Sequence, residues 1–200
     1  MAKRRKPLNV TIPVFNIEEV SLLAIKTEEE DYQLAYRLNT LFKFALYREV
    51  NFAYYEKNEN KEYFFSLFFY YDEKYKVYYF LIKTENEERK LHYLFEHASY
   101  ILLVIGSDHS KIAEDIKQRS INISDVFCCE HIDFLDSDSV RKPFLPKLTG
   151  KQYKKEMKDF MSDILSEENI QYFFETVLIG KNKEDKAKEE KTKNEFFQFW

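Results

Sequence analysis

An aromatic segment at residues 63–71 constrains the fold of this chain most strongly. Its alternate positions are apolar on both sides: Tyr63, Phe65, Leu67, Phe69 and Tyr71 on one, and Phe64, Phe68 and Tyr70 on the other. A half-exposed strand alternates apolar with polar residues, whereas a strand buried on both faces does not. The pattern predicts either a central strand covered on both sides or a strand that presents an aromatic face to a partner.

The surrounding segments predict a mixed fold. Polar turns separate residues 63–71 from strands at 50–55 and 77–83, which indicates a three-stranded antiparallel meander. Further strands are expected at residues 21–27, 100–105 and 126–134. An amphipathic helix is expected on the stripe Leu34, Leu38, Leu41, Phe42 and Ala45, and a second, capped by Asp108 or Ser110, up to about Arg119.

We therefore predict an α+β fold, in which helices pack on an aromatic-rich antiparallel sheet. The predicted organisation is a basic tail at 1–13, an α+β domain at 14–135 and a linker at 136–150. A helical pair at 151–180 is expected to dock on the domain, because both of its apolar stripes are too hydrophobic for water. Residues 181–200 are predicted to form a charged linker that ends in an aromatic peptide.

Composition narrows the class of protein. With 44% hydrophobic and 18% aromatic residues, the middle of the chain must fold. The formal net charge of −4 gives no overall positive field that would attract nucleic acid. The only cysteines, Cys128 and Cys129, are adjacent, and neighbouring cysteines rarely form a disulfide. Because no second pair exists, we expect a reducing compartment. No apolar run is long enough to span a bilayer, so we expect a cytoplasmic protein.

Several segments resemble the IPExxxVDY family of uncharacterised bacterial proteins. The resemblance rests on Asp31-Tyr32-Gln33-Leu34 with Asn39, on Phe65-Ser66-Leu67 with Tyr70, and on the apolar runs at 78–82 and 100–106. Aligned on Tyr100, the rest of the naming signature falls on His92-Tyr93-Leu94 and Ala98-Ser99, which differ from it. The resemblance covers about residues 20–135 and implies a cytoplasmic protein of Bacteroidetes-like origin, but no activity.

One predicted strand carries residues suited to metal or thiol chemistry. Cys129, His131 and Asp133 occupy alternate positions, so their side chains would share a face at spacings of roughly 6–7 Å. Cys129 and His131 could share a metal, or His131 could activate the thiol. The simpler interpretation is a half-buried strand with no ligand, since the chain has no C-x-x-C motif and no pair of histidines at ligand spacing.

Other patterns have ordinary structural explanations. The segment Gly106-Ser107-Asp108-His109-Ser110 could hold a phosphate at a helix start, but it lacks the glycines of a nucleotide-binding loop. Glu96 and His97 are expected on the surface. The aromatics of residues 63–71 lack the interleaved Lys and Arg of a stacking platform for nucleic acid, so we assign them to the core.

Both termini contain candidate interaction residues. Four consecutive basic residues, Lys3, Arg4, Arg5 and Lys6, could contact phosphates of RNA, of a ribosome or of membrane lipid, or could form a tail that only aids solubility. At the other end, Phe196, Phe197, Phe199 and Trp200 follow a charged segment. These rings either fold back onto the domain or dock in a groove of another protein, since large aromatic side chains are costly to leave in water.

The sequence thus favours a non-enzymatic interaction module that binds a protein or ribonucleoprotein partner through its termini. The motivation is that aromatic and basic residues lie outside the predicted core, while no catalytic set is organised. We expect no cofactor. The alternatives are an enzyme or metal-dependent module that uses Cys129, His131 and Asp133, and RNA or ribosome association through Lys3–Lys6.

Overall fold

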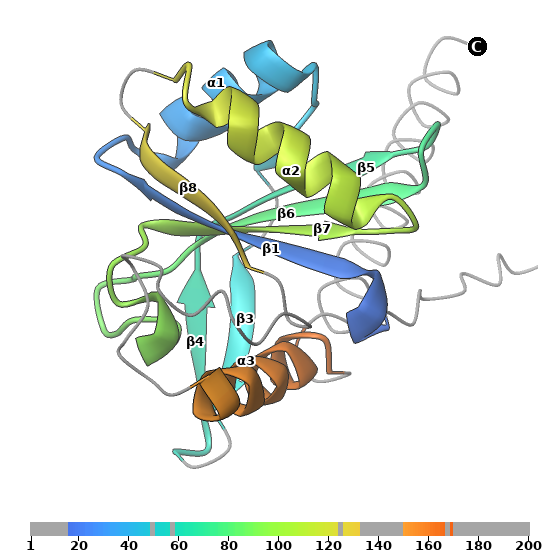
Figure 1. Cartoon of the computed structure of the whole chain (residues 1–200). Coiled ribbons are helices and arrows are strands. Elements are labelled where there is room, and N and C mark those ends of the chain that lie inside the picture. The colour runs from blue at the N-terminus through green and yellow to red at the C-terminus, as the bar shows by residue number, and fades with distance from the viewer. Residues whose placement is uncertain are drawn as a thin grey trace, which may run out of the picture.

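The computed structural model describes residues 16–48, 51–56, 59–123, 126–132, 150–166 and 169 of the chain. Its main element is a six-stranded sheet in the order β2-β5-β6-β7-β1-β8, in which every neighbouring pair is antiparallel (Figure 1). A separate hairpin pairs β3 with β4. The fold is therefore α+β, as the sequence predicts.

The elements have the following bounds. The strands are β1 (Val20–Thr27), β2 (Tyr47–Arg48), β3 (Phe52–Glu56), β4 (Lys61–Phe65), β5 (Leu67–Asp72), β6 (Val77–Lys83), β7 (Tyr100–Ile105) and β8 (Val126–Ile132). The helices are α1 (Asp31–Phe42), α2 (His109–Ser120) and α3 (Gly150–Ile164), with single 3-10 turns η1 (Ile17–Glu19) and η2 (Tyr93–Phe95).

The main sheet is covered on both faces. Helices α1 and α2 lie over one face, and α3 with the β3–β4 hairpin lies over the other (Figure 1). In β7 the side chains alternate between two cores: Tyr100, Leu102 and Val104 pack under the helices, and Ile101, Leu103 and Ile105 pack under the hairpin. This two-sided burial explains why β7 is an unbroken apolar run.

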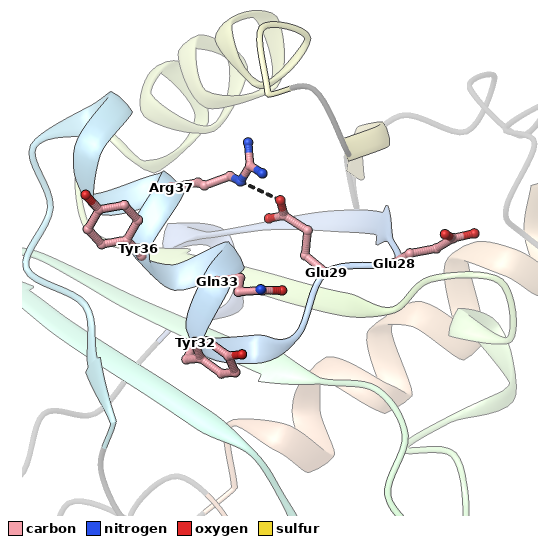
Figure 2. Close-up of a pocket in the computed structure, with 6 residues that line it drawn as sticks. All are labelled: Glu28, Glu29, Tyr32, Gln33, Tyr36 and Arg37. Atoms are coloured by element: carbon pink, nitrogen blue, oxygen red, sulfur yellow. Dashed lines mark ion pairs between the residues drawn. The ribbon is translucent and has the colours of Figure 1, made fainter.

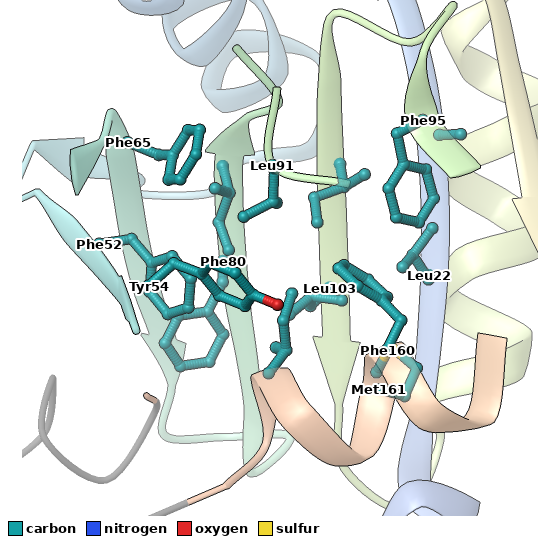
Figure 3. Packing of buried hydrophobic residues seen from close by; sticks show 14 of the residues in the cluster. Leu22, Phe52, Tyr54, Phe65, Phe80, Leu91, Phe95, Leu103, Phe160 and Met161 are labelled. Carbon is teal, nitrogen blue, oxygen red and sulfur yellow. The ribbon is translucent and has the colours of Figure 1, made fainter. Parts of the chain in front are cut away.

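The helix-side core is built around β1, β6 and β7. Its principal members are Leu23, Ile25, Leu34, Leu38, Tyr79, Leu81, Tyr100, Leu102, Ala113 and Ile116. The hairpin-side core (Figure 3) contains Leu22, Phe52, Tyr54, Phe65, Phe80, Leu91, Phe95, Leu103, Phe160 and Met161. Many of the aromatic residues in the described part of the chain thus belong to these two cores.

The predicted strand at residues 63–71 is wrong, because Ser66 divides it. β4 ends at Phe65 and belongs to the hairpin, whereas β5 begins at Leu67 and pairs with β6 in the main sheet. Between them, the Ser66 carbonyl accepts a hydrogen bond from Lys83 N at 3.0 Å. The three-stranded meander is therefore two hairpins in two different sheets.

The first helix is shorter than its apolar stripe predicts. α1 ends at Phe42, and Lys43 takes the left-handed conformation with φ of 61°, a common way for a helix to end. Ala45 therefore lies outside the helix, in the loop before β2. Asn39 holds this loop: its amide donates to the Leu46 carbonyl and accepts from Leu46 N, both at 2.8 Å.

Helix α3 matches the first helix of the predicted C-terminal pair. Met157, Phe160, Met161 and Ile164 are buried in the hairpin-side core, so this helix docks on the domain (Figure 3). Asn169 fastens its end, since its amide donates to the Asp163 carbonyl at 2.8 Å and its oxygen accepts from Tyr55 N at 3.0 Å. The basic tail, most of the linker, the second helix and the aromatic C-terminal peptide lie outside the described residues.

Candidate functional site

The predicted metal or thiol strand is β8, at one edge of the main sheet. Cys129 pairs with Ile25 of β1, and the backbone of His131 pairs with Leu23. The Cys129 side chain is half-buried and packs against the helix-side core. Asp133 lies outside the described residues, so the structure does not bring the three predicted groups together.

The other predicted residues are placed as follows. Both predicted terminal sites lie outside the described residues. These are the basic residues Lys3, Arg4, Arg5 and Lys6 and the aromatic residues Phe196, Phe197, Phe199 and Trp200. Glu96 and His97 are exposed, as expected. Asp108 occupies the N-cap position of α2 but makes no side-chain capping hydrogen bond, and His109 Nδ1 lies 2.8 Å from Ser21 Oγ.

A polar cluster joins the start of α1 to the break between β4 and β5. The Ser66 hydroxyl donates to Asp31 Oδ2, and Arg48 Nη1 donates to the same carboxylate and to Ser66 Oγ, both at 2.7 Å. Burial alone would raise the pKa of Asp31, but the hydrogen bonds from Ser66 and Tyr32 N and the charge of Arg48 outweigh it and hold this pKa below its usual value. The cluster fixes where α1 begins.

The turn between β1 and α1 is fixed by backbone-directed hydrogen bonds. Ser99 Oγ donates to the Thr27 carbonyl at 2.7 Å, and Tyr100 Oη donates to the Glu29 carbonyl at 2.9 Å. At the helix start, Glu30 N donates to Gln33 Oε1 at 3.2 Å, which is the side-chain half of a capping box. The first turn of α1 is therefore held from both the sheet and the helix.

This rigid turn presents two tyrosines to solvent (Figure 2). Tyr32 is 62% exposed and Tyr36 is 72% exposed. They are four residues apart, so they stand one above the other on the same face of α1. Beside them the Arg37 Nε forms an ion pair with Glu29, whose side chain is only 7% exposed.

The tyrosines line a hollow that we call the tyrosine groove. It has a volume of about 910 Å³ and is lined by Glu28, Glu29, Tyr32, Gln33, Tyr36 and Arg37 (Figure 2). A second hollow of about 350 Å³ shares Tyr36 and Arg37 and extends to Asn122 and Ile123 after α2. Ile121, next to it, is 82% exposed. Together they form an open, partly apolar surface along α1.

A second candidate is an acidic cleft between β3, η2 and α3. It has a volume of about 390 Å³ and is lined by Tyr54, Glu56, His92, Glu156, Asp159, Phe160 and Asp163. Tyr54 Oη donates to Asp163 Oδ2 at 2.5 Å, and His92 Nδ1 accepts from Leu94 N at 3.2 Å. The His92 proton in the neutral ring therefore lies on Nε2.

Burial and carboxylates set the electrostatics of this cleft. Burial lowers the pKa of His92 despite the nearby acids Glu156, Asp163 and Glu56. Burial raises the pKa of Tyr54, and the hydrogen bond to Asp163 raises it further. Burial and a hydrogen bond to Glu156 raise the pKa of Tyr93 to about 12. All three groups are thus neutral near pH 7, which suits a structural polar interface between α3 and the hairpin.

The structure also limits metal chemistry. Among the residues that it describes, no group of three or more His, Cys, Asp or Glu side chains is arranged to hold a metal ion. The acidic cleft therefore lacks a metal-ligand geometry within that part of the chain.

Sequence reasoning missed the tyrosine groove, although one signal could have found it. Tyr32 and Tyr36 lie in the predicted helix but off its apolar stripe of Leu34 and Leu38. Large aromatics on the polar face of an amphipathic helix are a recognisable sign of a contact surface. His92 gave no such signal, because its neighbours in the cleft are distant in sequence.

Comparisons with known proteins do not identify the chain. No family model, no curated protein and no solved structure matches it. The resemblance to the IPExxxVDY family therefore stays a prediction. None of the helices in the described ranges is long and apolar enough to cross a membrane.

Proposed function

We propose that this chain is a non-enzymatic, cytoplasmic protein-interaction module that binds a segment of a partner protein in the tyrosine groove. The single observation that carries the proposal is the pair of exposed tyrosines, Tyr32 and Tyr36, beside a hollow of about 910 Å³. Tyrosine is enriched at protein interfaces and often carries much of their binding energy.

The rigidity of the groove supports this role. The first turn of α1 is held by Asp31, Ser66 and Arg48 and by the Tyr100 hydroxyl on the Glu29 carbonyl. A surface that is ordered before binding loses less conformational entropy when the partner docks. The tyrosine backbone positions therefore need no rearrangement.

The charges around the groove indicate what kind of segment fits. The Glu29 carboxylate is neutralised by Arg37, whereas Glu28 is exposed. A partner segment with apolar side chains for the two tyrosine rings and a basic residue near Glu28 is complementary to this surface. Such an arrangement places the apolar contacts at the centre and the charge at the rim.

The test uses photocrosslinking in the native host. A photoreactive phenylalanine at position 36 is expected to crosslink a partner, and the double variant Tyr32→Ala/Tyr36→Ala is expected to lose that partner with an unchanged melting temperature. The matched control is position 64, where Phe64 is 53% exposed in β4 of the hairpin, on the other face of the sheet. If positions 36 and 64 crosslink the same proteins, the tyrosine groove is not the specific binding site and the proposal is wrong.

The terminal residues are tested in the same assay. A chain that ends at Asn194 lacks Phe196, Phe197, Phe199 and Trp200. If it keeps the partner of position 36 and loses another, the aromatic peptide is a second contact. A further variant with Lys3, Arg4, Arg5 and Lys6 changed to Ala is expected to lose RNA binding if the basic tail contacts phosphates, and that binding would be salt-sensitive.

A further inference from the structure

Another pocket lies on the helix-covered face of the sheet and includes neither tyrosine of the groove. It is formed where the end of α1, the β5–β6 turn and α2 meet, and its volume is about 380 Å³. It is lined by Phe42, Lys43, Phe44, Asp72, Tyr75, Tyr79, Asp108, Lys111, Ile112, Asp115, Ile116 and Arg119. We call it the aromatic pocket. Its size falls within the range of small-molecule sites, roughly 300–1,000 Å³.

The walls of the aromatic pocket are mainly ring faces and edges. The Tyr79 and Phe44 ring centroids are 4.4 Å apart, and Phe44 stacks on Phe42 at 5.4 Å. Arg119 lies over the Phe42 ring at 4.6 Å, which holds that ring in place. Tyr75, in the β5–β6 turn, is 53% exposed. These rings provide both a buried floor and an exposed edge.

The Tyr79 hydroxyl is the unusual group in this pocket. Tyr79 is only 3% exposed, yet its hydroxyl has no hydrogen-bond partner among the residues that the structure describes. Other buried tyrosines are satisfied: Tyr54 Oη donates to Asp163 and Tyr100 Oη donates to the Glu29 carbonyl. The Tyr79 Oη atom is not fully buried, and Tyr79 lines the pocket. Its hydroxyl therefore faces the pocket.

A buried hydroxyl normally finds a partner, because losing its hydrogen bonds to water costs about 1–3 kcal/mol. At Tyr79 the described part of the chain supplies no such partner, so the hydroxyl is left to bond with water or with a ligand in the pocket. The hydroxyl stays protonated at neutral pH because burial, and then the negative charge of Asp72, raise its pKa. It can therefore donate a hydrogen bond to a ligand.

The rim of the pocket carries balanced charges. Three side chains are basic, Lys43, Lys111 and Arg119, and three are acidic, Asp72, Asp108 and Asp115. Arg119 is engaged by Asp115 at 3.1 Å and by the Leu41 carbonyl at 2.5 Å. Asp72 accepts from Lys74 N at 2.9 Å and Tyr75 N at 3.1 Å. In the described part of the chain, the Lys43 and Lys111 ammonium groups have no such partner.

We propose that the aromatic pocket binds a neutral, planar heteroaromatic ring of the nucleobase class, which accepts a hydrogen bond from the Tyr79 hydroxyl. The ring stacks on the aromatic walls, with Tyr75 closing over it from the turn. Lys111 and Asp108 at the rim supply a donor and an acceptor for the ring edge. Nucleobases present both kinds of group along one edge, which matches this pattern.

Other ligand classes fit less well. A simple anion would meet three carboxylates at the rim, and a simple cation would meet three basic groups. A purely aliphatic ligand would leave the Tyr79 hydroxyl buried and unpaired, which is unfavourable. A planar ring with a hydrogen-bond acceptor can stack on the aromatic walls and accept a hydrogen bond from the Tyr79 hydroxyl.

The test is direct binding of four nucleosides to the full chain. Adenosine, guanosine, cytidine and uridine are each titrated at up to millimolar concentration by ligand-observed saturation-transfer NMR, with ribose 5-phosphate as the sugar-phosphate control. At least one nucleoside is expected to bind. Tyr79→Phe is expected to weaken it about fivefold or more, with an unchanged or raised melting temperature, because that hydroxyl bonds nothing in the described protein.

Two further variants separate binding from folding. Tyr75→Ala, at an exposed ring, is expected to weaken the nucleoside without affecting stability. Tyr54→Phe, which removes a bonded hydroxyl in the acidic cleft, is expected to lower the melting temperature and leave nucleoside affinity unchanged. The proposal is overturned if no nucleoside binds, if ribose 5-phosphate binds as tightly, or if Tyr79→Phe binds as the original chain does.

Discussion

At the scale of single residues, the structure depends on a few polar contacts between segments that are distant in sequence. Asp31, Arg48 and Ser66 join α1, β2 and the β4–β5 break, and Asn39 clamps the loop after α1. Asp31, Asn39 and Ser66 are among the residues on which the family resemblance rests. Their observed contacts give them a structural role, because each fixes where an element begins or ends.

The first prediction concerns Asp31. Asp31→Asn removes the charge that Arg48 and Ser66 contact, and we expect the free energy of unfolding to fall by about 1–2 kcal/mol at pH 7. Because the folded-state pKa of Asp31 is lowered, its contribution is present above the unfolded value of about 3.9 and is lost as pH falls through the folded pKa. Urea unfolding at pH 7 and at pH 2 measures both effects.

The control for Asp31 is Asp115→Asn. Asp115 pairs with Arg119 on an exposed helix surface, and its side chain is 58% exposed. Exposed pairs contribute little, so this variant should unfold at nearly the original urea concentration. An equal loss of stability in both variants, or a loss for Asp31→Asn that persists unchanged at pH 2, would contradict the assignment.

The second prediction concerns the buried tyrosines. Burial raises the folded-state pKa of Tyr54, Tyr79 and Tyr100 above the usual value. Their contribution to stability is therefore complete below the unfolded pKa of about 10 and is lost as pH rises toward the folded values. Urea unfolding from pH 8 to 11 should show stability falling above pH 10. Tyr100→Phe should reduce that slope.

At the scale of elements, periodicity predicts most helices and strands but not where the chain changes sheet. The apolar run of β7 and the stripe of α1 predict a buried strand and a helix, and both are found. Ser66 is a single small polar residue within an aromatic segment. It therefore leaves the two-residue alternation typical of a strand almost unchanged, and the sequence shows no break there. The break depends on its contacts with Asp31 and Lys83, which are distant in sequence and invisible to any local pattern.

The third prediction tests how strongly α3 docks. Phe160 is 2% exposed, and its ring centroid lies 4.9 Å from Phe95 and 5.0 Å from His92. Phe160→Ala leaves a cavity between α3 and the sheet, and we expect it to cost about 3–5 kcal/mol. Urea unfolding measures the loss. Lys158→Ala, at an exposed position of the same helix, is the control and should cost no more than about 0.5 kcal/mol.

At the scale of the whole molecule, the sequence predicts the class of the fold better than its sites. The fold class follows from patterns that recur along the chain, namely aromatic content and the spacing of apolar residues. An error in one element therefore does not change the prediction of an α+β core. The residues that line the tyrosine groove are close in sequence, between Glu28 and Arg37. The aromatic pocket, in contrast, brings together the end of α1, the β5–β6 turn and α2. Only tertiary packing defines that proximity, so no sequence spacing predicts it.

The last prediction follows from the two-sided burial of the main sheet. β7 lies between β6 and β1 and is covered by both cores, so its amides should exchange with solvent only through global unfolding. In the described part of the chain the β3–β4 hairpin is a two-stranded sheet of its own, so its amides should open at lower free energy. Hydrogen exchange read by mass spectrometry compares residues 100–105 with residues 61–65.

The same experiment on Phe160→Ala distinguishes two ways in which the molecule can lose structure. If α3 and the hairpin open together as one unit, the variant will speed exchange in β4 far more than in β7. If the two cores are a single cooperative unit, exchange in both strands will rise by the same factor, set by the loss of global stability. We expect the first result, because the main sheet keeps its helix-side core intact when the hairpin-side core is weakened.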